Sequence, residues 1–93
     1  MTFEEFASAP QEPREVSAAL RALWHDHRGN WERAHRIVMD EDDAACAWVH
    51  AYLHRTEGDL PNAGYWYRRA DRPTASGPLE AEWESIVRAL LAT

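Results

Sequence analysis

Residues 48–70 read WVHAYLHRTEGDLPNAGYWYRRA, which is the pattern of a helix, a Gly-Asp turn and a second helix. The first of these helices is apolar on most sides and is expected to end at Gly58. Asp59 is expected to cap the second helix, because Asp is a common residue at that position. The same stretch places His50 and His54 one helical turn apart. It therefore predicts a helical hairpin and identifies a pair of side chains at which chemistry is expected.

The rest of the chain is also expected to be helical, because no segment alternates apolar and polar residues for long enough to predict a strand. Helices are expected over residues 13–27, 31–39, 42–55, 60–70 and from Pro78 to near the C-terminus, after a short N-terminal turn capped by Thr2 and Glu5. The helix over residues 42–55 is apolar around most of its circumference and is expected to be the central, most buried element. The last helix is expected to pack as a cap at the end of the array.

Length and composition limit what this chain can be. Its 93 residues make one small helical-hairpin domain, which we place over residues 13–93, after an N-terminal segment, 1–12, with a short helical turn. The net charge of −6, with Arg as the only basic residue besides His, argues against binding to nucleic acid or to an anionic membrane. No segment approaches the ~20 apolar residues of a membrane span, so a cytoplasmic protein is expected. The composition, rich in Ala and Arg, suggests a bacterial one.

An internal repeat supports the hairpin interpretation. Gly29-Asn30-Trp31, followed by Ala34, aligns with Gly58-Asp59-Leu60, followed by Ala63, at a spacing of 29 residues. This pattern resembles the tetratricopeptide repeat and its Sel-like relatives, to which GDLPNAGYWYRRA is the closest match. The spacing is shorter than the ~34 residues usual for that family.

The resemblance implies antiparallel helical hairpins, about five helices in all, in a tetratricopeptide-like right-handed array. The segment over residues 48–70 also looks like stretches in small microbial proteins of unassigned function. The resemblance therefore implies an architecture and no particular activity, and function has to be argued from sites. Such architectures serve as scaffolds far more often than as catalysts.

Four of the five histidines are expected to lie at one level of the array. If the first three long helices pack antiparallel, a rise of 1.5 Å per residue brings these histidines to similar heights. They are His27, His35, His50 and His54. Imidazoles one turn apart can share a divalent metal ion such as zinc with a third histidine, and nickel, copper and iron also accept such ligands. Glu57, Asp26 or Asp59 is a candidate for the remaining ligand.

A simpler interpretation of the same histidines stays open. No standard zinc signature such as HExxH is present, and HxxxH spacing by itself is a weak signal in a helical protein. A buried polar layer that joins the histidines to Tyr52 and to the turn carboxylates fits the same pattern. Such a layer would make stability sensitive to pH near neutrality, where histidine titrates.

The aromatic run at residues 65–67 is the other notable feature. Consecutive helical residues are about 100° apart, so these three rings cannot all face one core and at least one is expected to be partly exposed. With the arginines that follow, the exposed ring could stack on a partner side chain or a nucleobase, or the arginines could hold a phosphate by bidentate contacts. The candidate binding residues are Tyr65, Trp66, Arg68 and Arg69. The alternative is that both sides of this helix pack against other helices.

The sequence thus favours a small helical-repeat module that binds a protein partner, through the aromatic and Arg positions or through the groove side of the first, third and fifth helices. Two alternatives remain: a metal-binding protein that uses His35, His50 and His54 with a carboxylate, and a self-associating helical domain. No catalytic residue is assigned, because no Ser or Cys has a recognisable base and orienting acid. Whether the chain is an enzyme is left open, with a non-enzymatic role favoured.

Overall fold

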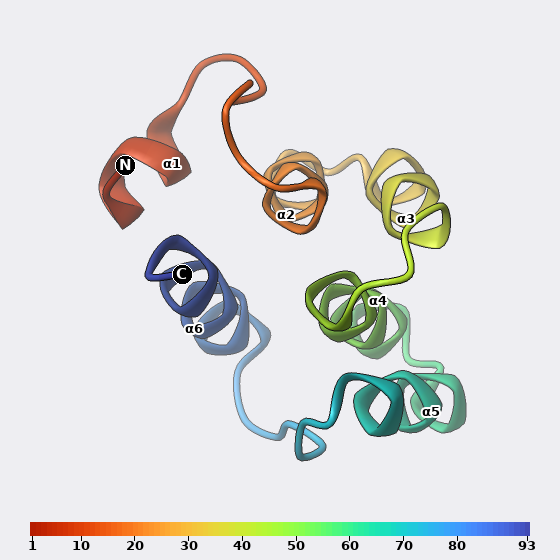
Figure 1. Ribbon diagram of the computed structural model, residues 1–93. Helices are drawn as coiled ribbons and strands as arrows, with labels where there is room; N and C mark the ends of the chain where they lie inside the picture. Colours follow the sequence, from red (N-terminus) through yellow and green to blue (C-terminus); the bar gives the residue numbers. More distant parts are fainter.

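The computed structural model describes all 93 residues, and it contains six α-helices and no strand (Figure 1). The helices are α1 (Phe3–Ser8), α2 (Ala18–His27), α3 (Trp31–Met39), α4 (Ala44–Thr56), α5 (Leu60–Ala70) and α6 (Leu79–Leu91). The all-α class predicted from the sequence is confirmed, with five longer helices after the short N-terminal one. None of the helices has both the length and the apolar composition of a membrane span.

Side-chain caps decide where the helices begin. The helix predicted over residues 13–27 begins only at Ala18, because the Ser17 hydroxyl accepts the Leu20 amide at 3.3 Å and caps the helix there. In the same way the Asp43 carboxylate caps α4, so that helix starts two residues later than predicted. The starts of α3 and α5 agree with the prediction.

Two glycines make the tight turns between successive helices. Gly29 ends the α2 segment with φ of +83°, and Gly58 ends the α4 segment with φ of +84°. These are left-handed backbone conformations, which glycine adopts without the steric cost that a Cβ brings. The turns keep α2 beside α3 and α4 beside α5.

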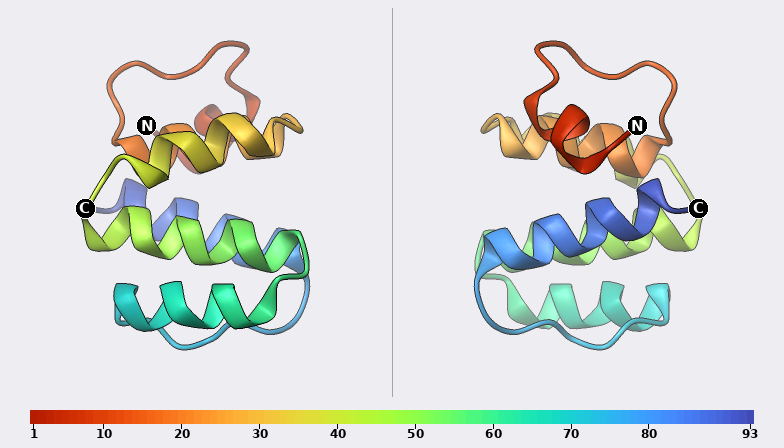
Figure 2. Two further views of the ribbon diagram at one scale, coloured as in Figure 1. Left: turned by 90° about the vertical axis from the view of Figure 1, so that its right-hand side faces the viewer. Right: turned by 90° about the vertical axis from the view of Figure 1, so that its left-hand side faces the viewer.

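The central helix is α4, as the sequence predicts. Every residue from Cys46 to His54 is buried. The helix packs against α2, α3, α5 and α6, and it lies between α3 and α5 in the side views (Figure 2). A helix covered on so many sides needs apolar residues around most of its circumference, which is what the sequence supplies.

The last helix does not extend the array beyond α5 as expected. It returns along a loop over residues 71–78 and packs on α1, α2 and α4 (Figure 1). Trp83 is the reason, because its buried indole donates from Nε1 to the Leu23 carbonyl at 3.0 Å. α6 therefore closes the core, and the expectation of a terminal cap is wrong.

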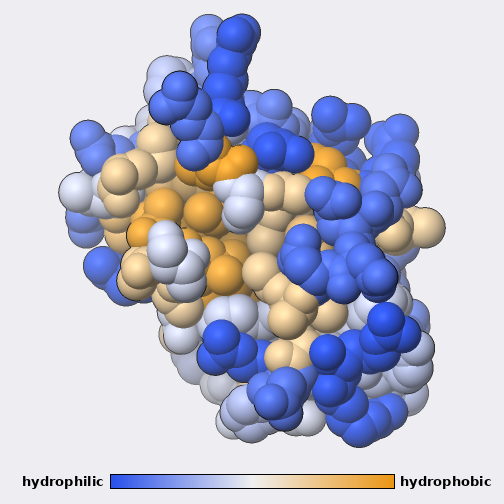
Figure 3. All heavy atoms as spheres, in the orientation of Figure 1, coloured by the Kyte–Doolittle hydropathy of each residue, from blue (hydrophilic) through white to orange (hydrophobic).

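The N-terminal segment packs against this returning helix. Phe6 is fully buried, and its ring and that of Phe3 lie 6.0 and 5.8 Å from the Trp83 ring. The Trp24 indole donates to the Ala9 carbonyl at 3.1 Å and holds the following segment. In the space-filling view, apolar side chains gather where α1, α2 and α6 meet (Figure 3).

A buried carboxylate ties α6 to α4 and α5. Glu82 accepts from the Arg55 guanidinium at 2.7 Å and from the Tyr67 hydroxyl at 2.5 Å. The side chains of Arg55 and Glu82 are only 12% and 7% exposed. Arg55 also donates to the Gly77 carbonyl in the loop before α6. Because both charges are largely withdrawn from water, each depends on the other for its stability.

Glu82→Gln is therefore expected to lower the free energy of unfolding by about 2 kcal/mol, because a neutral amide replaces the charged acceptor of two buried donors. Urea denaturation followed by circular dichroism measures the change. The matched control is Glu84→Gln on the same helix, where the carboxylate pairs with exposed Arg88. This variant is expected to lower the free energy of unfolding by less than about 0.5 kcal/mol. Equal losses in the two variants would contradict the buried role of Glu82.

Candidate functional site

Three of the four predicted histidines come together between α3 and α4. His35 projects from α3, and His50 and His54 project from successive turns of α4. One nitrogen from each ring lies within 4.8 Å of the other two. The Nε2 atoms of His35 and His50 are 3.1 Å apart, which is a hydrogen bond in which one ring donates and the other accepts. We call these three residues the histidine cluster.

Two tryptophans enclose the histidine cluster. Trp31 stacks on His35 with ring centroids 4.7 Å apart, and its Nε1 donates to the Leu53 carbonyl of α4 at 2.8 Å. Trp66 from α5 stacks on His50 with ring centroids 3.9 Å apart. His50 and His54 are buried and His35 is half-buried. The cluster thus has rigid aromatic walls on two sides and reaches the surface at His35.

The third ring is oriented by polar neighbours. The Nδ1 atom of His54 lies 2.6 Å from Glu57 Oε1, so this nitrogen carries the hydrogen that the carboxylate accepts. The Nε2 atom of the same ring then has a free lone pair and accepts from the Asn62 side-chain amide at 3.3 Å. A carboxylate that accepts from one imidazole nitrogen, and so leaves the lone pair on the other, is the arrangement found around metal-binding histidines.

Burial favours the neutral form of two rings of the cluster, His35 and His50. It lowers the pKa of His50 from the ordinary 6.5 to about 4, helped by repulsion from His35 and His54. Burial also lowers the pKa of His35, with His54 adding to the effect and Glu57 opposing it. Neutral imidazole is the form that binds a metal ion, so burial favours the ligand form of His35 and His50.

His27 does not join the cluster, which corrects the prediction of a four-histidine level. Its Nε2 atom lies 3.2 Å from Glu80 Oε1, and its ring lies 4.1 Å from the Trp83 ring. Both partners come from α6, whose return onto α2 occupies the side on which His27 projects. Asp26, suggested as a ligand, lies near His27 and Glu80 rather than beside the cluster, and burial raises its pKa to about 6.

Two groups, buried His50 and half-buried Asp26, are expected to act in opposite directions on stability between pH 6.5 and 4. On acidification the unfolded chain protonates at His50 before the folded chain does, so stability falls by up to about 3 kcal/mol. The titratable groups that face that ring are His35 and His54, and Trp66 stacks on it. Asp26 behaves in the opposite way, because its raised pKa lets the folded chain take up a proton first and gain stability.

Asp26→Asn removes only the second of these titrations, so this variant is expected to lose stability more steeply than the wild type on acidification. Urea denaturation of metal-free protein at about pH 7 and about pH 5 compares the two slopes. Parallel slopes would show that Asp26 titrates in the folded protein as it does in the unfolded chain.

The predicted binding residues on α5 divide between surface and interior. Tyr65 is 44% exposed, which confirms that one ring of the run reaches solvent, and Arg68 and Arg69 are exposed as well. Trp66 is half-buried against His50, and Tyr67 is buried against Glu82. The Arg69 guanidinium donates to the Tyr65 hydroxyl at 3.0 Å and lies 5.4 Å from the Trp66 ring centroid.

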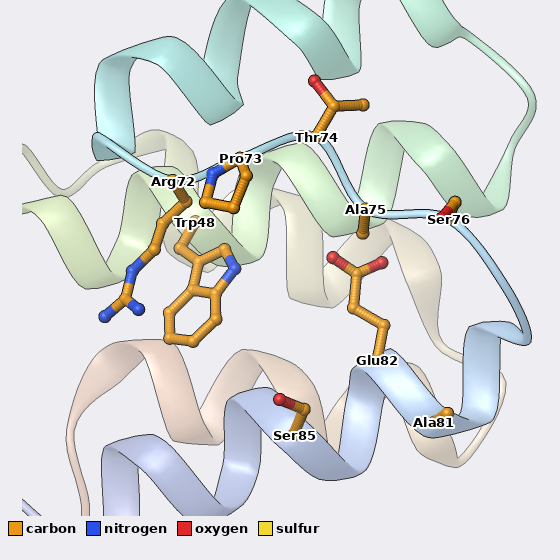
Figure 4. A pocket seen from close by; sticks show the side chains of 9 residues that line it. All are labelled: Trp48, Arg72, Pro73, Thr74, Ala75, Ser76, Ala81, Glu82 and Ser85. Atoms are coloured by element: carbon orange, nitrogen blue, oxygen red, sulfur yellow. The ribbon is translucent and has the colours of Figure 1, made fainter.

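A separate hollow of about 350 Å³ lies between α4, α6 and the loop over residues 71–78 (Figure 4). Its lining residues are Trp48, Arg72, Pro73, Thr74, Ala75, Ser76, Ala81, Glu82 and Ser85. The Arg72 guanidinium lies 3.8 Å from the Trp48 ring centroid, and Glu82 is held by Arg55 and Tyr67. The charged groups that line this hollow already have partners within the chain, which makes the histidine cluster the stronger candidate.

Sequence reasoning missed the roles of Trp31 and Asn62 in the cluster. Trp31 lies four residues before His35, the spacing that brings two rings together on a helix, so its stacking had a local signal. Asn62 meets His54 across a turn and had none. Comparison of the chain with protein-family models, with curated proteins and with solved structures gave no match. The functional argument therefore depends on the geometry described above.

Proposed function

We propose that this chain binds a divalent transition metal ion, zinc foremost, through His35, His50 and His54. The observation that carries the proposal is the convergence of three imidazole nitrogens within 4.8 Å of one another, on two adjacent helices. Burial lowers the pKa of His35 and His50 and favours the neutral form of these two rings, which is the form that binds a metal ion.

The spacing of the nitrogens supports this function. A tetrahedral zinc ion with Zn–N distances of about 2.0 to 2.1 Å holds neighbouring nitrogens about 3.3 Å apart. The Nε2 atoms of His35 and His50 are already at 3.1 Å. The ring of His54 needs a shift of at most about 1.5 Å to reach the same separation, given the 4.8 Å limit.

The position of Glu57 supports it as well. Its carboxylate fixes the His54 ring in the tautomer that leaves Nε2 unprotonated. A carboxylate in this position also makes the ring a better electron donor to a metal ion. Three imidazoles and no thiolate suit zinc, nickel or copper better than calcium or magnesium, which prefer oxygen ligands.

Competition titration tests the function. Protein purified without a histidine tag is expected to take up one equivalent of Zn²⁺ from a chromophoric chelator. Glu57→Gln is expected to weaken zinc binding by about 10- to 100-fold, because the amide orients the His54 ring less strongly. Glu84→Gln, which alters an exposed carboxylate on α6, serves as the control and should bind like the wild type. Zinc uptake far below one equivalent would refute the proposal.

We also propose that the two Gly-turn units, α2 with α3 and α4 with α5, are antiparallel hairpins of a tetratricopeptide-like array. The repeat of 29 residues and the positive φ of Gly29 and Gly58 support this relationship. The return of α6 onto α2 departs from a simple array, since it covers a side that a longer array would leave open.

A protein-binding surface on α5 is a second candidate function. It is favoured by the exposed ring of Tyr65, by Arg69 beside it, and by Met39, which is 57% exposed. Met39, Trp66 and Arg69 share a shallow hollow of about 340 Å³ with the acidic turn over residues 41–43. Cross-linking of wild-type and Tyr65→Ala protein, followed by mass spectrometry, tests for a protein partner that depends on this ring. Sedimentation tests self-association in the same samples.

A further inference from the structure

We infer that an ion held by the histidine cluster keeps one coordination position that no side chain of this chain fills, and that this position takes a small anion. The inference rests on the proposed metal site. It defines the ligand class of that site, which the three histidines by themselves leave open.

Only three side chains offer ligand atoms at the histidine cluster. The group of potential ligand atoms around His35 and His50 includes His54 and no carboxylate. Glu57 binds the Nδ1 side of the His54 ring, on the opposite edge from Nε2. Asp59 belongs to a second group with His54 and Glu57, and its carboxylate accepts the Asn62 backbone amide as the cap of α5. Neither carboxylate has to leave its partner for the three nitrogens to bind an ion.

Three histidines with one open position form the protein part of a zinc site that exchanges its fourth ligand, whereas closed structural sites use four protein ligands. The cluster also reaches the surface, since His35 is half-buried while its two partners are buried. Trp31 and Trp66 each stack on one ring of the cluster, and this crowding favours a small ligand over a large one.

Charge and hydrogen bonding favour an anion in that position. Imidazole ligands are neutral, so they do not offset the charge of a divalent ion. The one negative charge nearby is that of Glu57, which acts through the His54 ring. The site therefore keeps a net positive charge. The side-chain amide of Asn62 donates to His54 Nε2 at 3.3 Å, so a metal ion bound at that nitrogen would leave this donor free. An amide N–H there is a donor to an anion bound beside it.

Cobalt substitution with azide as the probe tests the inference. Co²⁺ bound by the cluster is expected to show the visible absorption of a four-coordinate ion, and azide is expected to shift that spectrum saturably. Asn62→Leu is expected to bind cobalt more weakly, because the His54 ring loses a polar neighbour, and to retain one equivalent at saturating cobalt. In that cobalt-saturated variant azide is expected to bind at least about tenfold more weakly than in the wild type, because a hydrogen bond to a charged group is lost. Gln11→Leu, which changes an exposed amide far along the chain, is the control for loss of an amide.

Each outcome is decisive. Failure of cobalt to bind would refute the proposed metal site itself. Cobalt uptake with a spectrum indifferent to azide would keep the metal site and overturn the open position. Failure of Asn62→Leu to take up cobalt at any concentration, in a variant that circular dichroism shows to be folded, would overturn the inference, because Asn62 would then act as a ligand. Dimerisation on cobalt binding, seen by sedimentation, would overturn it too, because a second copy would then fill the position.

Discussion

His50→Ala is expected to lower the affinity for zinc by more than about 100-fold, a larger loss than removal of an orienting neighbour produces. His50 is the central ring of the cluster, 3.1 Å from His35 and stacked at 4.9 Å on His54. Its removal leaves two rings without the nitrogen that links them. The chelator competition used for the wild-type protein measures the loss.

The control for this variant is His25→Ala, which deletes a histidine outside the cluster. His25 pairs with Glu12 at 2.8 Å, so its loss is expected to leave zinc binding unchanged. Because His50 is buried against Trp66, His50→Gln, which fills more of the space, separates loss of a ligand from loss of packing. Retention of wild-type affinity in both His50 variants would exclude the histidine cluster as the metal site.

Trp83→Ala is expected to lower the free energy of unfolding by about 3 to 5 kcal/mol. The indole is 2% exposed, contacts the rings of Phe3, Phe6 and His27, and donates to Leu23. Truncation leaves a cavity among α1, α2 and α6 and removes the indole donor to the Leu23 carbonyl. Native domains have only about 5 to 15 kcal/mol of stability, so this one change would consume a large share of it.

Urea denaturation followed by circular dichroism measures this effect without relying on tryptophan emission. Leu79→Ala on the same helix is the comparison, because Leu79 is 40% exposed and its truncation is expected to cost less than about 1 kcal/mol. Similar costs for the two variants would mean that α6 is not anchored to the core through Trp83.

The local parts of the fold could be predicted from the sequence. Periodicity and composition give the five longer helices, and Gly29 and Gly58 mark two of their ends because only local conformation is involved. The start of α2 was predicted too early because the Ser17 cap was not weighed against Pro13. The path of α6 could not be predicted, since the contact of Trp83 with Leu23 joins residues far apart in the chain and leaves no periodic signal.

In the candidate site, too, the local features could be predicted from the sequence and the long-range contacts could not. His50 and His54 share a face by helical spacing, and simple stacking of helices brings His35 to them. His27 was misplaced because its environment depends on α6, which supplies Glu80 and Trp83. The tautomer of His54, set by Glu57 and Asn62, depends on atomic contacts that residue spacing does not specify.

The histidine cluster lies at the seam between the two Gly-turn units, with His35 on one unit and His50 and His54 on the other. An ion that bridges the two units would bind only the folded chain, because the unfolded chain does not hold the three rings together. The stability of the fold would then depend on the free concentration of the ion. Above the dissociation constant, each tenfold rise in free ion adds about 1.4 kcal/mol to the stability of the docked units. In a chain this small, ion availability would set how much of the population keeps its two halves together.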